Sequence, residues 1–154
     1  MKRFLFLMLV ACAHAQPLDK PLPPLEIRTL EGAKMRMDEL RGPALIDLWA
    51  TWCVPCLRTM PFYAKLAKDT GLQVIAISVD AAGVPVKEWI AQHPAPFQWF
   101  RDPDGAAAER LGVVAMPTSF LIDAQGRVRA RHDGFREEDL AVLEKEVRAL
   151  LGSP

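Results

Sequence analysis

The sequence predicts an α/β fold in which helices flank both faces of a central mixed β-sheet. Apolar strand candidates alternate with helical segments, and a hairpin and a helix end the chain, which is the order expected for such a sheet. The length of 154 residues suits one domain, and a hydrophobic fraction of 51% is enough for a sizeable core. The 19 basic and 19 acidic residues balance, which argues against nucleic-acid binding and against a disordered chain.

The first 15 residues have the three parts of a secretory signal peptide. Lys2 and Arg3 are basic, residues 4–11 are apolar, and Ala13-His14-Ala15 is a small-x-small cleavage site. The apolar run is far shorter than the roughly 20 residues that span a bilayer. We therefore expect export and a soluble mature chain that begins at Gln16. In an alternative interpretation, Leu9-Val10-Ala11-Cys12 resembles a lipobox, and Cys12 would carry a lipid anchor.

The first half of the mature chain contains the most apolar strand. Residues 16–25 hold four prolines and form an expected extended lead-in, so the globular domain is expected over 26–152. Short strands are expected at 26–29 and 35–37. Residues 43–50 are nearly all apolar, as in a strand whose sheet is covered on both faces. A helix is expected at 53–69, followed by a strand at 73–79, a helix at 85–92 and a strand at 97–100.

The second half is predicted to end in a hairpin and a helix. An Ala-rich helix is expected at 104–111, and strands at 118–123 and 127–132 flank a turn at Gly126. Arg127, Arg129 and Arg131 alternate along the last strand, which predicts one solvated face. The helix at 137–151 has acidic residues in its first turn, where they favour the helix dipole.

The residues of this sequence best suited to catalysis are the pair Cys53 and Cys56. Two intervening residues at the start of a helix bring the two sulfur atoms close enough to bond. The first backbone N–H groups and the helix dipole stabilise negative charge at Cys53, so we expect a lowered pKa and an exposed thiolate nucleophile. Cys56, one turn further and more buried, is placed to attack the mixed disulfide that Cys53 forms with a substrate.

Two other interpretations of the cysteine pair are open. Half of a zinc site is one, but a closed site needs four ligands, and His93 and His132 have no paired spacing. We therefore expect no metal and no cofactor. A purely structural disulfide is the other, although so small a loop stabilises little through chain entropy.

Asp47 is the one charged residue inside the apolar strand. A buried carboxyl group with a raised pKa would accept the proton of Cys56 as that thiol attacks. Alternatively, Asp47 reaches solvent or a helix amide. Trp49 and Trp52 would shield the cysteines and form a docking surface, with ordinary core packing as the alternative for Trp49.

The run from Asp47 to Cys56, followed by Pro61 and by Met116-Pro117-Thr118, resembles the thioredoxin superfamily. The resemblance implies a thioredoxin-like fold in which a cis proline, here Pro117, faces the cysteine pair. It also implies that the backbone of Met116 pairs with an extended substrate strand beside Cys53, with Trp52 in the same substrate-binding surface.

Within the superfamily, the chain most resembles the exported TlpA/ResA-type thiol-disulfide oxidoreductases. Trp-Ala-Thr-Trp-Cys-x-Pro-Cys and the run from Phe120 to Asp123 carry this likeness, which covers residues 24–151. It implies a periplasmic, monomeric dithiol protein that reduces protein disulfides, often for cytochrome c maturation, with electrons from a membrane donor. The chain departs from the family pattern at Thr59, where some members carry an acid, and at Ala76, which matches a thioredoxin lysine.

Two further functions compete with a reductase. A thiol peroxidase shares the fold, although its reactive cysteine usually lies in a different motif. A binding module could hold Cu(I) on the soft dithiol, although no third ligand lies nearby in the sequence. The Val54-Pro55 dipeptide does not reveal whether the pair acts as a reductant or an oxidant.

Overall fold

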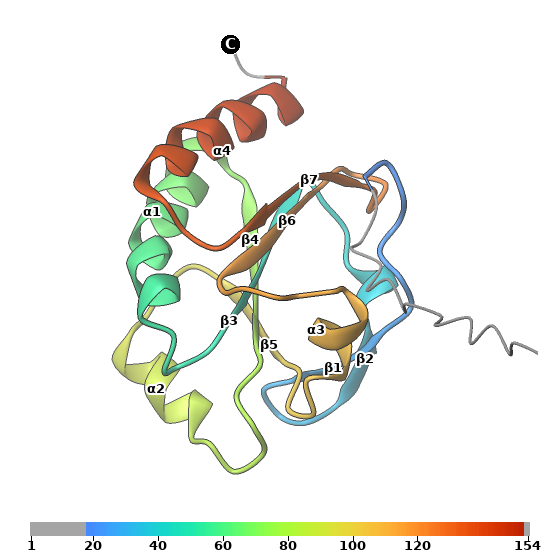
Figure 1. Cartoon of the computed structure of the whole chain (residues 1–154), viewed down its shortest axis with the longest axis vertical. Helices are drawn as coiled ribbons and strands as arrows, with labels where there is room; N and C mark the ends of the chain where they lie inside the picture. The colour runs from blue at the N-terminus through green and yellow to red at the C-terminus, as the bar shows by residue number, and fades with distance from the viewer. Residues whose placement is uncertain (1–17, 153–154) are drawn as a thin grey trace, which may run out of the picture.

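The computed structural model describes residues 18–152 (Figure 1). The predicted signal peptide and Cys12 lie outside the described residues. The described part of the chain contains seven strands, four α-helices and one short 3₁₀ helix, and every element predicted there is present within a few residues. In order these are β1 (Glu26–Thr29), β2 (Lys34–Arg36), η1 (Met37–Glu39), β3 (Ala44–Trp49), α1 (Val54–Thr70), β4 (Gln73–Ser78), α2 (Val86–Gln92), β5 (Gln98–Arg101), α3 (Ala106–Arg110), β6 (Thr118–Ile122), β7 (Val128–Asp133) and α4 (Glu137–Leu150).

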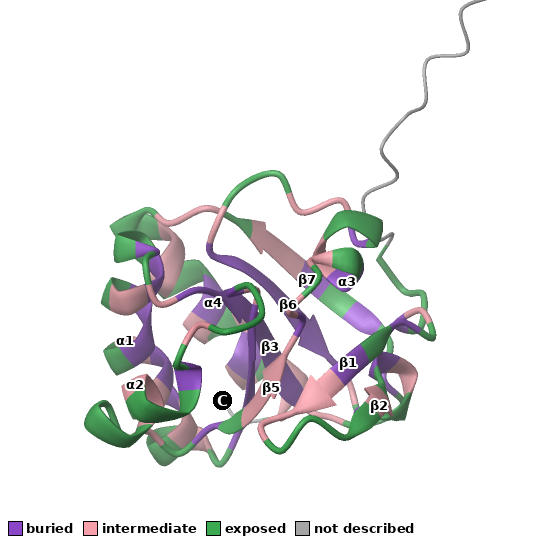
Figure 2. Cartoon of the chain, turned by 90° about the horizontal axis from the view of Figure 1, so that it is seen from below, coloured by how far each residue is buried: buried purple, intermediate pink, exposed green. Residues whose placement is uncertain are grey.

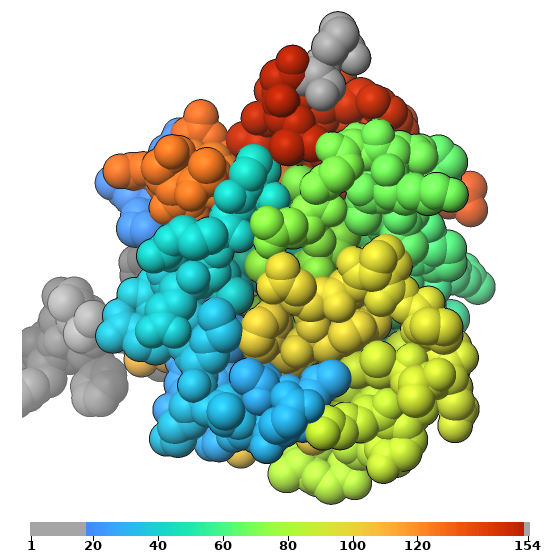
Figure 3. Space-filling model, turned by 180° about the vertical axis from the view of Figure 1, so that it is seen from behind, coloured from blue at the N-terminus to red at the C-terminus, as the bar shows by residue number. Residues whose placement is uncertain are grey.

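The strands form one mixed sheet in the order β2-β1-β5-β4-β3-β6-β7. Strands β3, β4 and β5 are parallel, and the pairs at both edges are antiparallel. Strand β3 lies near the centre and all six of its residues are buried. Figure 3 shows the blue segment that holds β1 against the yellow segment that holds β5, as their pairing requires.

Side chains alternate between the two faces of the sheet. In β3, Leu45 and Trp49 pack toward α1, α2 and α4, whereas Ile46 and Leu48 pack toward α3 and η1. Figure 2 shows the buried central strands between these two layers. The predicted α/β architecture with helices on both faces is therefore confirmed.

The described part of the proline-rich lead-in, residues 18–25, packs on the fold, but it begins with a turn rather than an extended segment, with Asp19 in a left-handed conformation (φ 61°). Its backbone pairs with β7, through Asp19 N–H to Val128 O (2.7 Å) and Val128 N–H to Lys20 O (2.9 Å). Leu22 and Leu25 are buried in the core on the α3 side of the sheet. The described residues before β1 thus cover part of that core.

The prediction of one solvated arginine face on β7 is wrong for Arg131. Its guanidinium lies over the ring of Phe120 and donates to the carbonyl oxygens of Leu111 (2.7 Å) and Gly112 (2.8 Å). The alternation correctly places the arginines on one face of β7, but the segment that follows α3 covers the part of this face at Arg131. Arg131 therefore anchors the beginning of the loop that leads to Pro117.

Truncation of Leu22 tests whether the lead-in is part of the fold. Because Leu22 is 3% exposed, Leu22→Ala should lower the free energy of unfolding by about 2–5 kcal/mol. The matched control Leu18→Ala removes a side chain that is 54% exposed and should change it by less than about 0.5 kcal/mol. Urea unfolding of the oxidised proteins measures both, and equal effects would contradict the packing of the lead-in.

Candidate active site

The cysteine pair lies where β3 runs into α1. The chain leaves β3 at Trp49 and turns over residues 50–53, with the N–H of Cys53 donating to Ala50 O (3.1 Å). Cys53 is the N-cap residue of α1, and its Sγ accepts from the N–H of Cys56 (3.3 Å). Pro55 lies in the first helical turn, where backbone N–H groups have no partner within the helix. The missing N–H of proline therefore costs no hydrogen bond there. The sequence places Cys53 at the helix terminus, as predicted.

Cys53 and Cys56 form a disulfide in this structure, with their Cα atoms 5.3 Å apart. Cys56 is fully buried, whereas Cys53 is 4% exposed and lines a groove. Cys53 is therefore the sulfur that a substrate can reach, although in the disulfide it is less exposed than the sequence suggested. Cys56 lies behind it.

The groove beside Cys53 has a volume of about 830 Å³ and is mainly apolar. The loop before β6 forms one wall and the start of α1 forms another. Trp52, Val54 and Val114 are among the most exposed large hydrophobic side chains of the described residues, and all three line this groove. Its other lining residues are Cys53, Pro55, Val79, Gly105, Ala108, Glu109, Val113, Ala115 and Met116.

Pro117 follows a cis peptide bond, as the resemblance implied. Pro117 is buried, and the preceding Met116 lines the groove with Cys53. The carbonyl oxygen of Pro117 accepts from the N–H of Gly134 (2.7 Å), which ties the loop to the end of β7. The geometry brings Trp52, Cys53 and Met116 to one surface; their contact with substrate stays a prediction.

Asp47 is buried on the α1 face of the sheet and has no hydrogen-bond partner for either carboxyl oxygen. It reaches neither solvent nor a helix amide, so that alternative is wrong. Burial raises its pKa well above the usual value, because the charged form loses its water without gaining a donor. Asp47 therefore holds a proton to a higher pH than an exposed aspartate does.

Tyr63 lies close to Asp47, and the sequence did not indicate it as a site residue. Burial first, and then the charge on Asp47, raise the pKa of Tyr63, while hydrogen bonding with Thr59 and Ser119 acts in the opposite direction. Ser119 stands directly opposite Asp47 in the β3–β6 pairing. The four side chains form a buried polar cluster, and the i, i+4 spacing of Thr59 and Tyr63 was the only signal for it.

Trp49 belongs to the core. It is fully buried against Trp89 and Trp99, with ring centroids 4.8 and 5.4 Å away. The core-packing alternative is therefore correct for Trp49, while Trp52 is 66% exposed in the groove.

Asp80, whose role the sequence did not define, is fully buried at the end of β4. Its carboxylate accepts from the N–H of Thr51 (2.9 Å), the hydroxyl of Thr51 (2.7 Å) and the hydroxyl of Ser78 (2.8 Å). Thr51 is in the turn that carries Cys53, so Asp80 connects that turn to the sheet.

Within residues 18–152, no three His, Cys, Asp or Glu side chains are grouped to hold a metal ion. In the same range, no helix combines the length and the apolar character needed to cross a bilayer.

The fold and the site define a thioredoxin-like protein with a disulfide-bonded cysteine pair at the start of a helix. Comparison with known proteins shows a match to the AhpC/TSA family over residues 18–131. The chain therefore belongs to the AhpC/TSA family, and its resemblance to the thioredoxin-like proteins is confirmed.

Among curated relatives, the thiol-disulfide oxidoreductase ResA of Bacillus thuringiensis subsp. konkukian is 33% identical over 115 residues, which cover 72% of this chain and 66% of ResA. The thiol:disulfide interchange protein DsbE of Pseudomonas fluorescens biotype C is 36% identical over 124 residues, which cover 79% of this chain and 69% of DsbE. The chain thus spans about two thirds of the length of these relatives.

A crystal structure of a DsbE-type thiol:disulfide interchange protein from Chlorobium tepidum superimposes with a TM-score of 0.77. It is 34% identical, and the match covers 90% of this chain and 100% of that one. The similarity therefore extends over nearly the whole described fold.

The raised pKa of Asp47 predicts how stability depends on pH. In the unfolded chain Asp47 ionises near pH 3.9, but in the fold it stays protonated to a higher pH, so its contribution to stability falls as pH rises between these two values. Each unit of difference removes about 1.4 kcal/mol. The free energy of unfolding of Asp47→Asn, relative to the wild type, should therefore rise by more than about 1 kcal/mol between pH 4 and pH 8.

Urea unfolding of the oxidised proteins at these two pH values measures the change. Asp104→Asn, at an exposed acid, is the control and should leave the pH profile of the wild type unchanged. Parallel profiles for Asp47→Asn and the wild type would contradict a protonated Asp47.

Proposed function

We propose that this protein is an exported thiol-disulfide oxidoreductase that reduces protein disulfides through Cys53 and Cys56. One observation carries the proposal: a cysteine pair that closes a disulfide at the N-terminus of α1 and opens, through Cys53, onto an apolar groove beside a cis proline. The similarity to the thiol-disulfide oxidoreductase ResA and the thiol:disulfide interchange protein DsbE supports it.

In the reduced protein, the Cys53 thiolate attacks one sulfur of a substrate disulfide. A Cys53–substrate mixed disulfide forms, and the other substrate sulfur leaves as a thiolate that takes up a proton. Cys56 then attacks Cys53, releases the second substrate thiol and closes the disulfide seen here. Two electrons pass from the protein to the substrate, and a second donor must return them.

Asp47 is the proposed proton acceptor for Cys56. The thiol of Cys56 must lose its proton to attack, and its sulfur is fully buried. Asp47 lies on the sheet face that α1 covers, and its raised pKa makes its ionised form a stronger base toward the thiol of Cys56 than an exposed aspartate would be. Asp47 therefore acts on the second step rather than on the attack by Cys53.

The substrate is an extended polypeptide that lies in the groove. The backbone at Met116 offers it strand-like pairing, Trp52 lines the same groove as the reacting sulfur, and Pro117 follows Met116 through the cis bond. The apolar lining favours hydrophobic residues beside the substrate cysteine, because their burial on binding is favourable.

Export, partners and pathway belong to the same proposal. The predicted signal peptide, cleaved after Ala15 or lipidated at Cys12, would deliver the protein to the periplasm, where disulfides persist. A membrane donor would reduce the Cys53–Cys56 disulfide, and a monomer suffices for the chemistry. By likeness to ResA and DsbE, the disulfides of cytochrome c maturation are the proposed substrates.

Trapping tests the order of attack. Cys56→Ser should hold a disulfide-bonded peptide on Cys53 as a stable mixed disulfide, because no thiol remains to release it. Cys53→Ser, the matched control, should hold none. Mass spectrometry after incubation with a peptide disulfide measures the adduct, and equal labelling of the two variants would overturn the roles assigned to the sulfurs.

Activity separates the reductase from a thiol peroxidase. With dithiothreitol as the electron source, the wild type should reduce insulin at least tenfold faster than Cys53→Ser. Its hydrogen peroxide consumption should equal that of the same variant. A peroxide rate that depends on Cys53 and exceeds the insulin rate would replace the proposal by the peroxidase.

A reduction potential fixes the direction of electron flow. A reductant should lie well below about −200 mV, whereas strongly oxidising thioredoxin-like proteins lie near about −120 mV. Equilibration with glutathione, followed by alkylation of free thiols, measures the value. A result near the oxidising limit would reverse the proposed direction.

A further inference from the structure

The structure places a second buried carboxylate next to the active-site turn. Asp80 is fully buried, and all three of its hydrogen-bond donors are neutral groups from Thr51 and Ser78. A backbone N–H can only donate, and both hydroxyl groups donate to the carboxyl oxygens, so the set suits an acceptor-only, ionised carboxylate. Asp80 therefore holds a negative charge inside the protein.

The connection from Asp80 to Cys53 is short. Thr51 follows Ala50, whose carbonyl oxygen accepts from the N–H of Cys53 (3.1 Å). On the other side, the N–H of Val79 donates to Trp49 O (2.8 Å), and Val79 lines the groove with Cys53. The carboxylate, itself buried, thus lies against the turn that carries the nucleophile.

We propose that Asp80 is a positioning residue that holds the Cys53 turn and, through its buried charge, disfavours the Cys53 thiolate and so biases the pair toward the disulfide. This inference rests on the proposed function, because it concerns the same thiols. A buried anion repels a thiolate nearby, which destabilises the reduced protein relative to the disulfide. The effect opposes that of the helix dipole, which stabilises the thiolate, and it makes the protein a stronger reductant. Strong oxidants show the converse, because their reduced form is stabilised.

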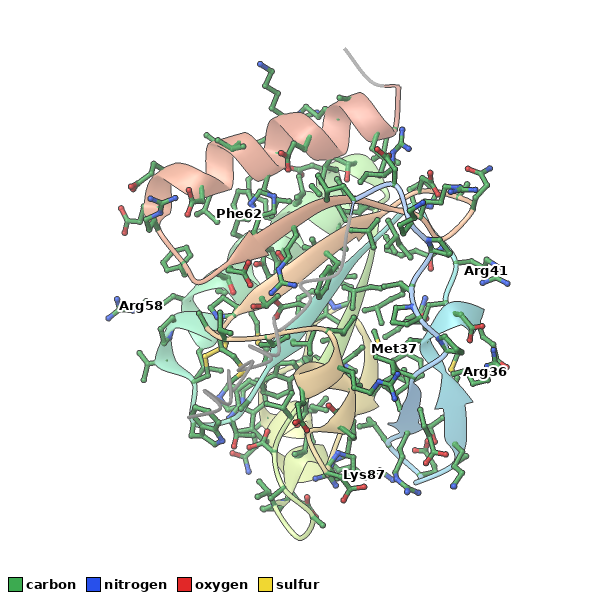
Figure 4. All side chains as sticks on the ribbon, turned by 45° about the vertical axis from the view of Figure 1, so that its right-hand side comes forward. Arg36, Met37, Arg41, Arg58, Phe62 and Lys87 are labelled. Carbon is green, nitrogen blue, oxygen red and sulfur yellow. A yellow bond between two sulfur atoms is a disulfide. The ribbon has the colours of Figure 1, made fainter. Side chains whose placement is uncertain are left out.

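Other charged groups near the turn remain in place when Asp80 is changed. Arg101 donates to the backbone carbonyl oxygens of Asp80 (3.4 Å) and Ala81 (3.1 Å), and Glu109 lines the groove. Arg58 on α1 points away from the fold into solvent (Figure 4). Asp47 is buried within β3, and Asp102, whose N–H donates to Ser78 O (2.7 Å), is buried after β5. Because each is common to the wild type and the variants, a comparison isolates Asp80.

The measured reaction is the exchange of the protein disulfide with two glutathione thiols, which gives the protein dithiol and one glutathione disulfide. Two electrons and two protons move to the protein. Asp80→Asn keeps the shape and removes the charge, so it should stabilise the Cys53 thiolate and shift the equilibrium toward the dithiol. At pH 8 we expect a shift of about tenfold, which corresponds to about 30 mV.

The pH dependence distinguishes charge from structure. At a pH at least one unit below the Cys53 pKa, measured for each reduced protein from its alkylation rate, the thiol is protonated in both proteins, so the charge of Asp80 has no thiolate to repel and the shift should fall below twofold. A change that merely distorted the disulfide would shift the equilibrium equally at both pH values. Thr51→Val, the matched control, removes one donor but keeps the anion, and should shift the equilibrium less than threefold at pH 8.

A second variant that removes the Asp80 charge covers the case in which the first does not fold. If Asp80→Asn does not fold, as judged by circular dichroism of the oxidised protein, Asp80→Ser replaces it with the same expectation. An unchanged equilibrium at pH 8, a pH-independent shift, or an equal shift in Thr51→Val would overturn the role of Asp80. Insulin reduction by the wild type is assayed in parallel, so failure of the reductase proposal is seen independently of the potential difference.

Discussion

Strand β3 is hydrogen-bonded along both edges and buried at every position, and the active site depends on this constraint. A slip of one residue would turn Asp47 and its neighbours to the opposite face, so the hydrophobic pattern fixes the register. The end of β3 then fixes where α1 begins and where Cys53 lies. Because β4 runs parallel to β3 and β6 antiparallel to it, the end of β4 and the start of β6 meet at the same edge. Asp80, Cys53 and Pro117 are brought together in this way.

The sequence predicted the elements whose signals are local. Apolar runs defined β3 and β4, and Gly71 ended α1 as expected, in a left-handed conformation that glycine adopts without steric cost. The cysteine spacing at a helix start predicted the disulfide, and the resemblance supplied the cis bond before Pro117. In each case the few residues in the motif contain the physical reason for the structure.

What the sequence did not predict depends on partners far along the chain. The hydrogen bonds from Thr51 to Asp80 cross 29 positions, and those from Arg131 to the end of α3 cross about 20. Tyr63 and Ser119 meet beside Asp47 only after α1 has packed on the sheet. Such contacts leave no periodic pattern in the sequence. The position of an acid such as Asp80 at the end of a strand was the only local sign of them. The burial of Leu22 in the core was not predicted for the same reason, since four prolines indicate an extended segment but not what lies under it.

The buried acids Asp47 and Asp80 have opposite environments, and the difference lies in their hydrogen-bond donors. Asp47 has none, and the position that carries a lysine in thioredoxins is occupied by Ala76, its partner across β4, so the neutral form is favoured. Asp80 receives three donors, which suit the charged form. The carboxyl group of Asp47, with its raised pKa, can exchange a proton with a neighbouring group, whereas the carboxylate of Asp80, held by its donors, acts through its charge on every charge that forms near Cys53. One carboxyl group therefore serves the step in which a proton moves, and the other alters the equilibrium between the two sulfur states without taking part in either attack.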